Sequence, residues 1–168
     1  MNVSFRFADK ENLAPLLPQL FSILHGNMSA IAPTGASYEE DFALWSGYIA
    51  PALAQEERQL VLMHRAGELA GYFQYSLQGS RLLMEEIQIA PAHQGSGLFR
   101  ALYAWLEQAL PSQPETVEAY AHKENLQSQA ILERMGLERA GENPGGTSWH
   151  YRGSCREMWE RLRCSKRT

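Results

Sequence analysis

Hydrophobic and polar positions recur with two different periods along this chain, and the two periods predict a mixture of strands and helices. Alternating or continuous apolar runs of strand length predict strands at residues 3–7, 59–64, 69–76, 82–89, 117–121, 137–140 and 148–152. Apolar residues at helical spacing predict helices at residues 9–24, 37–53, 98–110 and 125–135. The chain is therefore expected to be an α/β protein.

Local signals mark the ends of several of these elements. Ser37 with Glu40 three positions later forms a capping box, and Asp9 is a candidate cap for the first helix, with Pro15 in its first turn. Residues 26–35 are expected to form a loop, and residues 65–68 a tight hairpin turn. Gly136 lies where the last of these helices should stop.

The order of elements limits the possible folds. Strands that are separated by helices must be largely parallel, whereas strands joined by hairpins are antiparallel. We therefore expect one mixed central sheet of about six or seven strands with flanking helices.

A glycine-rich turn joins the strand that ends at Ile89 to the helix that opens at Leu98. Gly95 and Gly97 permit positive φ angles, and the first amides of a helix lack intrahelical partners at the positive end of its dipole. Such a turn is a receptor for a phosphate or pyrophosphate group. A P-loop is excluded because no Gly-Lys pair occurs in the chain. A dinucleotide site would need glycine in place of Arg100 and an acid at the end of the next strand, but Glu118 falls inside that strand.

Two segments resemble the GNAT-type N-acetyltransferases. Gln94 and Gly97, after a strand that ends in a proline turn, resemble the acyl-coenzyme A loop of that family, although Phe99 replaces its usual small residue. Asn125 and the Gly136-Leu137 pair match a second family segment in their spacing, with Leu132 where the family often has tyrosine. Without these matches, the glycines would be read as a simple turn.

The resemblance implies a GNAT fold and an acetyl-CoA site. It implies that the backbone amides from Gly95 to Phe99 hold the pyrophosphate beside Arg100, and that pantetheine pairs with strand 87–89 where it splays from the strand containing Tyr120. The residues expected to bind the cofactor are Ile87, Gln88, Ile89, Gln94, Gly95, Ser96, Gly97, Leu98, Phe99, Arg100, Asn125 and Ser128.

The expected reaction moves an acetyl group from acetyl-CoA to a primary amine of a small molecule or peptide by direct attack. A general base must deprotonate the amine. Glu85 is the first candidate because it shares a strand face with Ile87 and Ile89, and Glu86 on the opposite face is the second. Tyr120, His122 and Ser128 remain candidate acids. Phe99 and Leu132 favour an alternative, a non-catalytic acyl-CoA-binding sensor or interaction module.

Composition excludes several other classes. The 168 residues carry a net charge of −4, which does not indicate a nucleic-acid partner, and no apolar run reaches the ~20 residues of a membrane span. The two cysteines, Cys155 and Cys164, form no metal-binding pattern and are typical of a cytoplasmic protein. We expect a GNAT acetyltransferase domain at residues 1–152. A helical extension at residues 153–168 would dock on it or on a second subunit of a homodimer.

Overall fold

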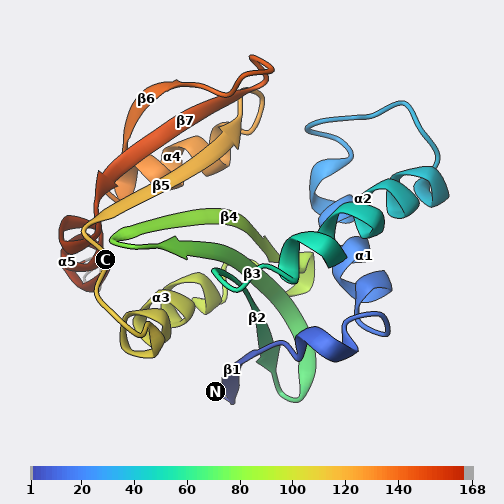
Figure 1. Cartoon of the computed structure of the whole chain (residues 1–168), viewed down its shortest axis with the longest axis horizontal. Coiled ribbons are helices and arrows are strands. Elements are labelled where there is room, and N and C mark those ends of the chain that lie inside the picture. Colours follow the sequence, from blue (N-terminus) through green and yellow to red (C-terminus); the bar gives the residue numbers. More distant parts are fainter. Residues whose placement is uncertain (1, 165–168) are drawn as a thin grey trace. The chain divides into compact units, whose positions relative to one another are not determined.

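A computed structural model describes residues 2–164. Within these residues, seven strands share one sheet in the order β1-β2-β3-β4-β5-β7-β6 (Figure 1). Neighbours β4 and β5 are parallel, whereas β1–β2, β5–β7 and β6–β7 are antiparallel. The expected mixed α/β sheet is confirmed. The described residues form two compact units: the first comprises residues 2–75 and 86–98, and the second comprises residues 76–85 and 99–164.

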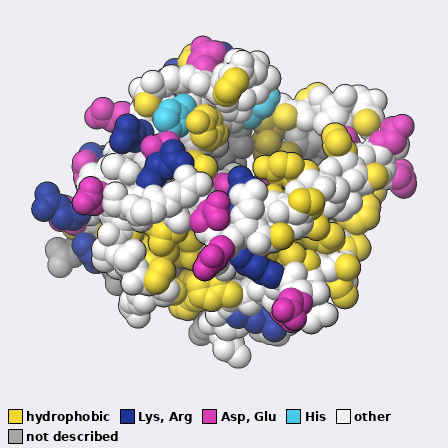
Figure 2. All heavy atoms as spheres, viewed as in Figure 1, with side chains coloured by type: hydrophobic (Ala, Val, Ile, Leu, Met, Phe, Trp, Pro, Cys, Tyr) yellow, Lys and Arg dark blue, Asp and Glu magenta, His cyan; other side chains and the backbone are white. Residues whose placement is uncertain are grey.

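The first unit contains the N-terminal strands and two helices. Its elements are β1 (Val3–Phe7), the short 3-10 helix η1 (Lys10–Asn12), α1 (Leu17–Met28), α2 (Tyr38–Leu53), β2 (Arg58–Arg65), most of β3 (Glu68–Gln78), the end of β4 (Arg81–Ile89) and the 3-10 helix η2 (Pro91–His93). Leu20 of α1, Leu53 of α2, Leu62 of β2 and Tyr72 of β3 are buried in one cluster. Figure 2 shows hydrophobic side chains exposed where Figure 1 places α1 and α2; those of α2 include Leu44 and Tyr48.

Two local predictions for this unit are confirmed. Ser37 caps α2 through a complete capping box, in which the Ser37 side chain accepts from the Glu40 N–H and the Glu40 carboxylate accepts from the Ser37 N–H. The hairpin between β2 and β3 turns at Ala66 and Gly67, whose φ angles are 53° and 89°. Two consecutive positive φ angles match the right-handed twist of the flanking strands.

The start of the first helix was predicted incorrectly. Asp9 caps the short η1, where its carboxylate accepts from the Glu11 N–H, and α1 begins only at Leu17. Pro18, and not Pro15, therefore lies in the first turn of α1. Proline fits the first turn of a helix, where its missing N–H costs nothing. At its other end α1 extends to Met28, into the segment predicted as a loop.

The second unit packs three helices with the remaining strands. Its elements are the beginning of β4, α3 (Leu98–Ala109, from its second residue), β5 (Thr116–His122), α4 (Leu126–Arg134), β6 (Glu138–Glu142), β7 (Ser148–Ser154) and α5 (Cys155–Cys164). Along β5, Val117, Ala119 and Ala121 are buried on one face. Side chains alternate along a strand, so Glu118 and Tyr120 belong to the other face.

Helix α5 docks on the body of the second unit. It buries Cys155, Met158 and Trp159, and the Trp159 ring lies 6.1 Å from the ring of Tyr103 on α3. Arg163 forms an ion pair with Glu107. Residues 165–168 of the predicted extension lie outside the described residues. No helix within residues 2–164 is long and apolar enough to span a membrane.

Candidate functional site

The glycine turn has the backbone geometry that the sequence predicts. Gly95 and Gly97 have φ angles of 69° and 81°, a region that side chains rarely adopt. A Cβ atom added at either glycine would meet no other atom within 4 Å. The turn leads into the first residue of α3, Leu98, which is buried. The backbone of this turn is therefore uncovered on its outer side.

Three amide side chains lock the end of β4 to the last turn of α1. The Asn27 Nδ2 group donates to Gln88 Oε1 at 2.9 Å and to the Ile89 carbonyl at 3.0 Å. Gln94 Nε2 donates to the same carbonyl at 3.1 Å and to Asn27 Oδ1 at 3.2 Å. The sequence singled out Gln88 and Gln94 but missed Asn27. In this arrangement the three side chains support the turn through contacts within the protein.

Other predicted turn residues also make contacts within the chain. The Ser96 hydroxyl donates to the His93 carbonyl at 2.5 Å, which closes the turn from inside. The Phe99 ring lies 4.7 Å from the ring of Tyr103, one helical turn further along α3. The Arg100 side chain is exposed. The bulky residue that departs from the family pattern is thus packed along its own helix.

Strands β3 and β4 approach closely just before the turn. A Cβ atom at Gly71 of β3 would lie 2.3 Å from the Gln88 carbonyl oxygen and 3.1 Å from the Ile89 Cα atom. The Ala90 N–H donates to the Ala70 carbonyl at 2.9 Å, immediately beyond this contact. Only glycine fits at position 71 without displacing the backbone of residues 88–89.

The two candidate bases lie at adjacent positions on β4, and both are partly exposed. Glu86 accepts a hydrogen bond from the hydroxyl group of Tyr72, which is buried in the cluster between α1, α2 and β3. Burial, and next the neighbouring Glu86 carboxylate, raise the pKa of Tyr72 well above its usual value, so Tyr72 stays a donor. This bond orients the Glu86 carboxylate. Glu85 belongs to the second unit.

The second family-like segment forms the start of α4. Asn125 is the N-cap, and its Oδ1 atom accepts from the Ser128 N–H at 3.0 Å. Leu132, at the position of the family tyrosine, is buried. Gly136 ends this helix with a φ angle of 92°, as predicted. In this structure the Asn125 side chain caps the N-terminus of α4.

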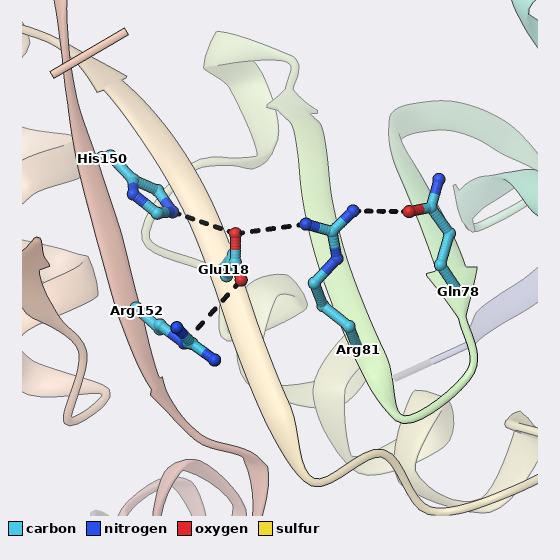
Figure 3. Close-up of polar contacts among 5 residues, drawn as sticks. All are labelled: Gln78, Arg81, Glu118, His150 and Arg152. Atoms are coloured by element: carbon cyan, nitrogen blue, oxygen red, sulfur yellow. Dashed lines mark hydrogen bonds and ion pairs between the residues drawn. The ribbon is translucent and has the colours of Figure 1, made fainter. Parts of the chain in front are cut away.

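A charged cluster on the second unit was missed at the sequence level. The Glu118 side chain is only 9% exposed, and its Oε2 atom lies 3.0 Å from His150 Nε2 (Figure 3). Arg81 Nη1 of β4 lies 3.7 Å from Oε2, and Arg152 Nε of β7 lies 3.8 Å from Oε1. The cations come from strands on both sides of β5. The apolar pattern of the sequence predicts that Glu118 lies in a strand, but it does not predict which residues of the neighbouring strands lie beside Glu118.

Comparisons with known proteins identify relatives of this chain. The sequence profile of the acetyltransferase (GNAT) family matches residues 17–137. A comparison with curated protein sequences finds no match. An acetyltransferase structure from Thermus thermophilus aligns with a TM-score of 0.71 and 18% identity, over 92% of this chain and 97% of that chain.

Two further solved structures, each a complex with coenzyme A, share this fold. The aminoglycoside acetyltransferase AAC(6')-Ib aligns with a TM-score of 0.65 and 20% identity, over 96% of this chain and 99% of that chain. The PaiA N-acetyltransferase from Thermoplasma acidophilum aligns with a TM-score of 0.65 and 11% identity, over 92% of this chain and 99% of that chain. At these identities the likeness establishes the fold.

Proposed function

Because this chain belongs to the acetyltransferase (GNAT) family, we propose that it transfers the acetyl group of acetyl-CoA to a primary amine of a small molecule or peptide. The observation that carries the proposal is the uncovered turn at Gly95 and Gly97, with positive φ at both glycines and a helix directly behind. Two solved relatives of the same fold are complexes with coenzyme A, which supports this cofactor.

The turn supplies the chemistry that a diphosphate needs. The first N–H groups of a helix lack intrahelical acceptors and lie at the positive end of its dipole. In our proposal the backbone N–H groups from Gly95 to Phe99 bind the diphosphate beside Arg100. The main chain at residues 87–89 binds the pantetheine arm. Asn27 and Gln94 act through the Ile89 carbonyl, so they are positioning residues for both segments.

We propose Glu86 as the general base, in preference to Glu85. An ammonium ion cannot attack, so its proton must first pass to a carboxylate directly or through water. The hydrogen bond from Tyr72 fixes the Glu86 carboxylate, and this fixed position supports the assignment. The amine nitrogen then bonds to the thioester carbonyl carbon, a backbone N–H stabilises the oxyanion, and the carbon–sulfur bond breaks.

The sulfur leaves as a thiolate, and the nitrogen, which still carries one proton more than the amide product, gives that proton to the thiolate directly or through water, so that coenzyme A leaves as the free thiol. Leu132 is buried at the position where the family often has a tyrosine acid. A thiolate with an ordinary thiol pKa can leave without a dedicated acid at modest cost. The reaction therefore depends mainly on positioning and oxyanion stabilisation.

A two-step assay tests this function. First, acetyl-CoA should raise the melting temperature of the wild type but not that of Gly97→Val, because valine strains the turn. Gly67→Val is the matched control: its φ of 89° is similarly positive, its Cβ also meets no atom within 4 Å, and it lies in the β2–β3 hairpin. Second, release of free thiol across a panel of amines measures turnover. Cofactor binding without turnover of any amine would support the sensor alternative.

Compartment and assembly stay predictions. Both cysteines are free thiols, Cys155 buried and Cys164 exposed, which agrees with the expected reducing cytoplasm. The apolar face of α5 is used within its own chain, so a homodimer would need another surface. Mass in solution, measured by light scattering, tests this expectation.

A further inference from the structure

We infer that Arg81, Arg152 and Tyr120, on the open face of β4, β5 and β7, form a binding site for a ligand that carries a carboxylate group. On the proposed function, this ligand is the amine acceptor, which would then be an amino acid or another carboxylate-bearing amine. Only the identification of this ligand as the amine acceptor rests on the proposed function.

Strand register brings these side chains to one face. Arg152 of β7 is the partner of Glu118, and His150 is the partner of Tyr120. Arg81 of β4 is the partner of Thr116, which shares the face of Glu118 because side chains alternate. Figure 3 shows Arg81 on one side of Glu118 and His150 with Arg152 on the other. Figure 2 shows histidine and Lys or Arg side chains together where Figure 1 places β5 and β7.

The two guanidinium groups retain unused donors. Their ion pairs with Glu118, at 3.7 and 3.8 Å, are too long to be hydrogen bonds. Arg81 Nη2 donates to Gln78 Oε1 at 2.5 Å, whereas the terminal nitrogens of Arg152 have no partner among the described residues. The two side chains are 41% and 59% exposed. A guanidinium with free terminal N–H groups is a bidentate receptor for a carboxylate.

An aromatic surface borders these donors. Tyr120 is 47% exposed, and its ring stacks on that of His150 at 4.8 Å with an interplanar angle of 20°. His150 Nε2 is held by Glu118, which fixes the imidazole ring on which Tyr120 stacks. The Tyr120 hydroxyl has no hydrogen-bond partner within residues 2–164 and offers a further donor. The stacked rings give a flat apolar surface beside the two cations.

The charges around Glu118 exclude a ligand that would bind there through an ammonium group. Glu118 would be the natural partner of an ammonium group, but three basic side chains surround it. Glu138 of β6 is the register partner of Arg152 but forms no ion pair with it in the described part of the chain. Two permanent cations with one paired carboxylate leave a net positive site. A carboxylate ligand therefore fits, and its ammonium group must lie elsewhere.

Matched substrate pairs test the inference. The wild type, saturated with acetyl-CoA, is assayed with ω-amino acids of two to five methylene groups and with the corresponding amino amides. At least one acid should exceed its amide in kcat/KM by about tenfold to a hundredfold, the usual effect of a hydrogen bond to a charged group. Arg152→Gln should remove this preference, because kcat/KM should fall for the acid and stay unchanged for the amide. Equal rates for every pair, or a preference that survives in Arg152→Gln, would overturn the inference.

Controls separate binding from folding and from the proposed function. Arg156→Gln removes a guanidinium that is 88% exposed on α5 and should change nothing. If Arg152→Gln fails to fold because Glu118 loses a partner, Tyr120→Phe provides the second test, with a smaller loss for acids only. If no amine is acetylated, calorimetric titration of the protein with the same acids and amides measures whether the site binds a carboxylate. Carboxylate binding that is lost in Arg152→Gln upholds this site and rejects the acetyltransferase, whereas no binding rejects both.

Discussion

Replacing Gly71 by alanine tests how closely β3 must approach the proposed cofactor strand. The new Cβ would start 2.3 Å from the Gln88 carbonyl oxygen, whereas real Cβ atoms essentially never come within 3.0 Å of such a neighbour. The two strands must therefore separate by at least about 0.7 Å. Overpacking of this kind costs about 1–3 kcal/mol of the free energy of unfolding. For a chain of this size, that lowers the melting temperature by roughly 2–12 °C.

The same displacement should weaken cofactor binding, because it moves the main chain of residues 88–89. Losing one hydrogen bond to that segment lowers the affinity for acetyl-CoA by about threefold to tenfold. Thermal melting without cofactor and calorimetric titration with acetyl-CoA measure the two effects. Gly47→Ala is the control: this exposed glycine lies inside α2, a Cβ atom added there would meet no atom within 4 Å, and alanine should stabilise the helix by about 0.5–1 kcal/mol. Melting and affinity of Gly71→Ala equal to the wild type would refute the reasoning.

Three further predictions concern catalysis, pH and packing. Glu86→Gln should lower kcat by about 10²- to 10⁴-fold with little change in KM for acetyl-CoA, and part of the loss should be recovered at high pH, where more of the amine is neutral. Burial raises the pKa values of Tyr75 and Cys155 to about 12 from ordinary values near 10 and 9. The unfolded chain therefore releases these protons first, and stability should fall by about 1.4 kcal/mol per pH unit for each group, between pH 9 and 12 for Cys155 and between pH 10 and 12 for Tyr75. Trp159→Ala should cost about 3–5 kcal/mol, read from urea unfolding.

Each of these predictions has a contrary result. Glu85→Gln is the comparison for the base, and a larger loss of kcat there than in Glu86→Gln would reverse the assignment. A melting temperature that stays constant from pH 9 to 12 would contradict the burial of the two titrating groups. Leu126→Ala is the packing control, because Leu126 is 72% exposed on α4 and its truncation should cost little.

The sequence predicts well those features that are fixed by neighbours along the chain. The capping box at Ser37, the hairpin at Ala66 and Gly67, and the glycine turn all depend on a few consecutive residues, and all three are present. The start of α1 also depends on neighbouring residues, but its prediction was wrong because two nearby prolines are each compatible with a helix start. Local chemistry there did not decide between Pro15 and Pro18.

The features that the sequence could not predict depend on pairing between distant segments. Asn27 reaches Ile89 across 62 positions, and only the placement of α1 against β4 makes it a positioning residue. The placement of Arg81 and Arg152 on either side of Glu118 requires both the parallel register with β4 and the antiparallel register with β7. Periodicity gives the face on which a side chain lies, but it does not give the residue beside it on the next strand.

The double contact at the Ile89 carbonyl limits what a ligand can do at the end of β4. A carbonyl oxygen has two lone pairs, and here the amide groups of Asn27 and Gln94 occupy both, at 3.0 and 3.1 Å. An amide proton of an incoming thioester carrier therefore finds no vacant acceptor at this oxygen. The Gln88 carbonyl oxygen faces Gly71 of β3, so the next carbonyl on this edge of β4 is that of Ile87. In the proposed complex, this limits how far the carrier can slide along the strand.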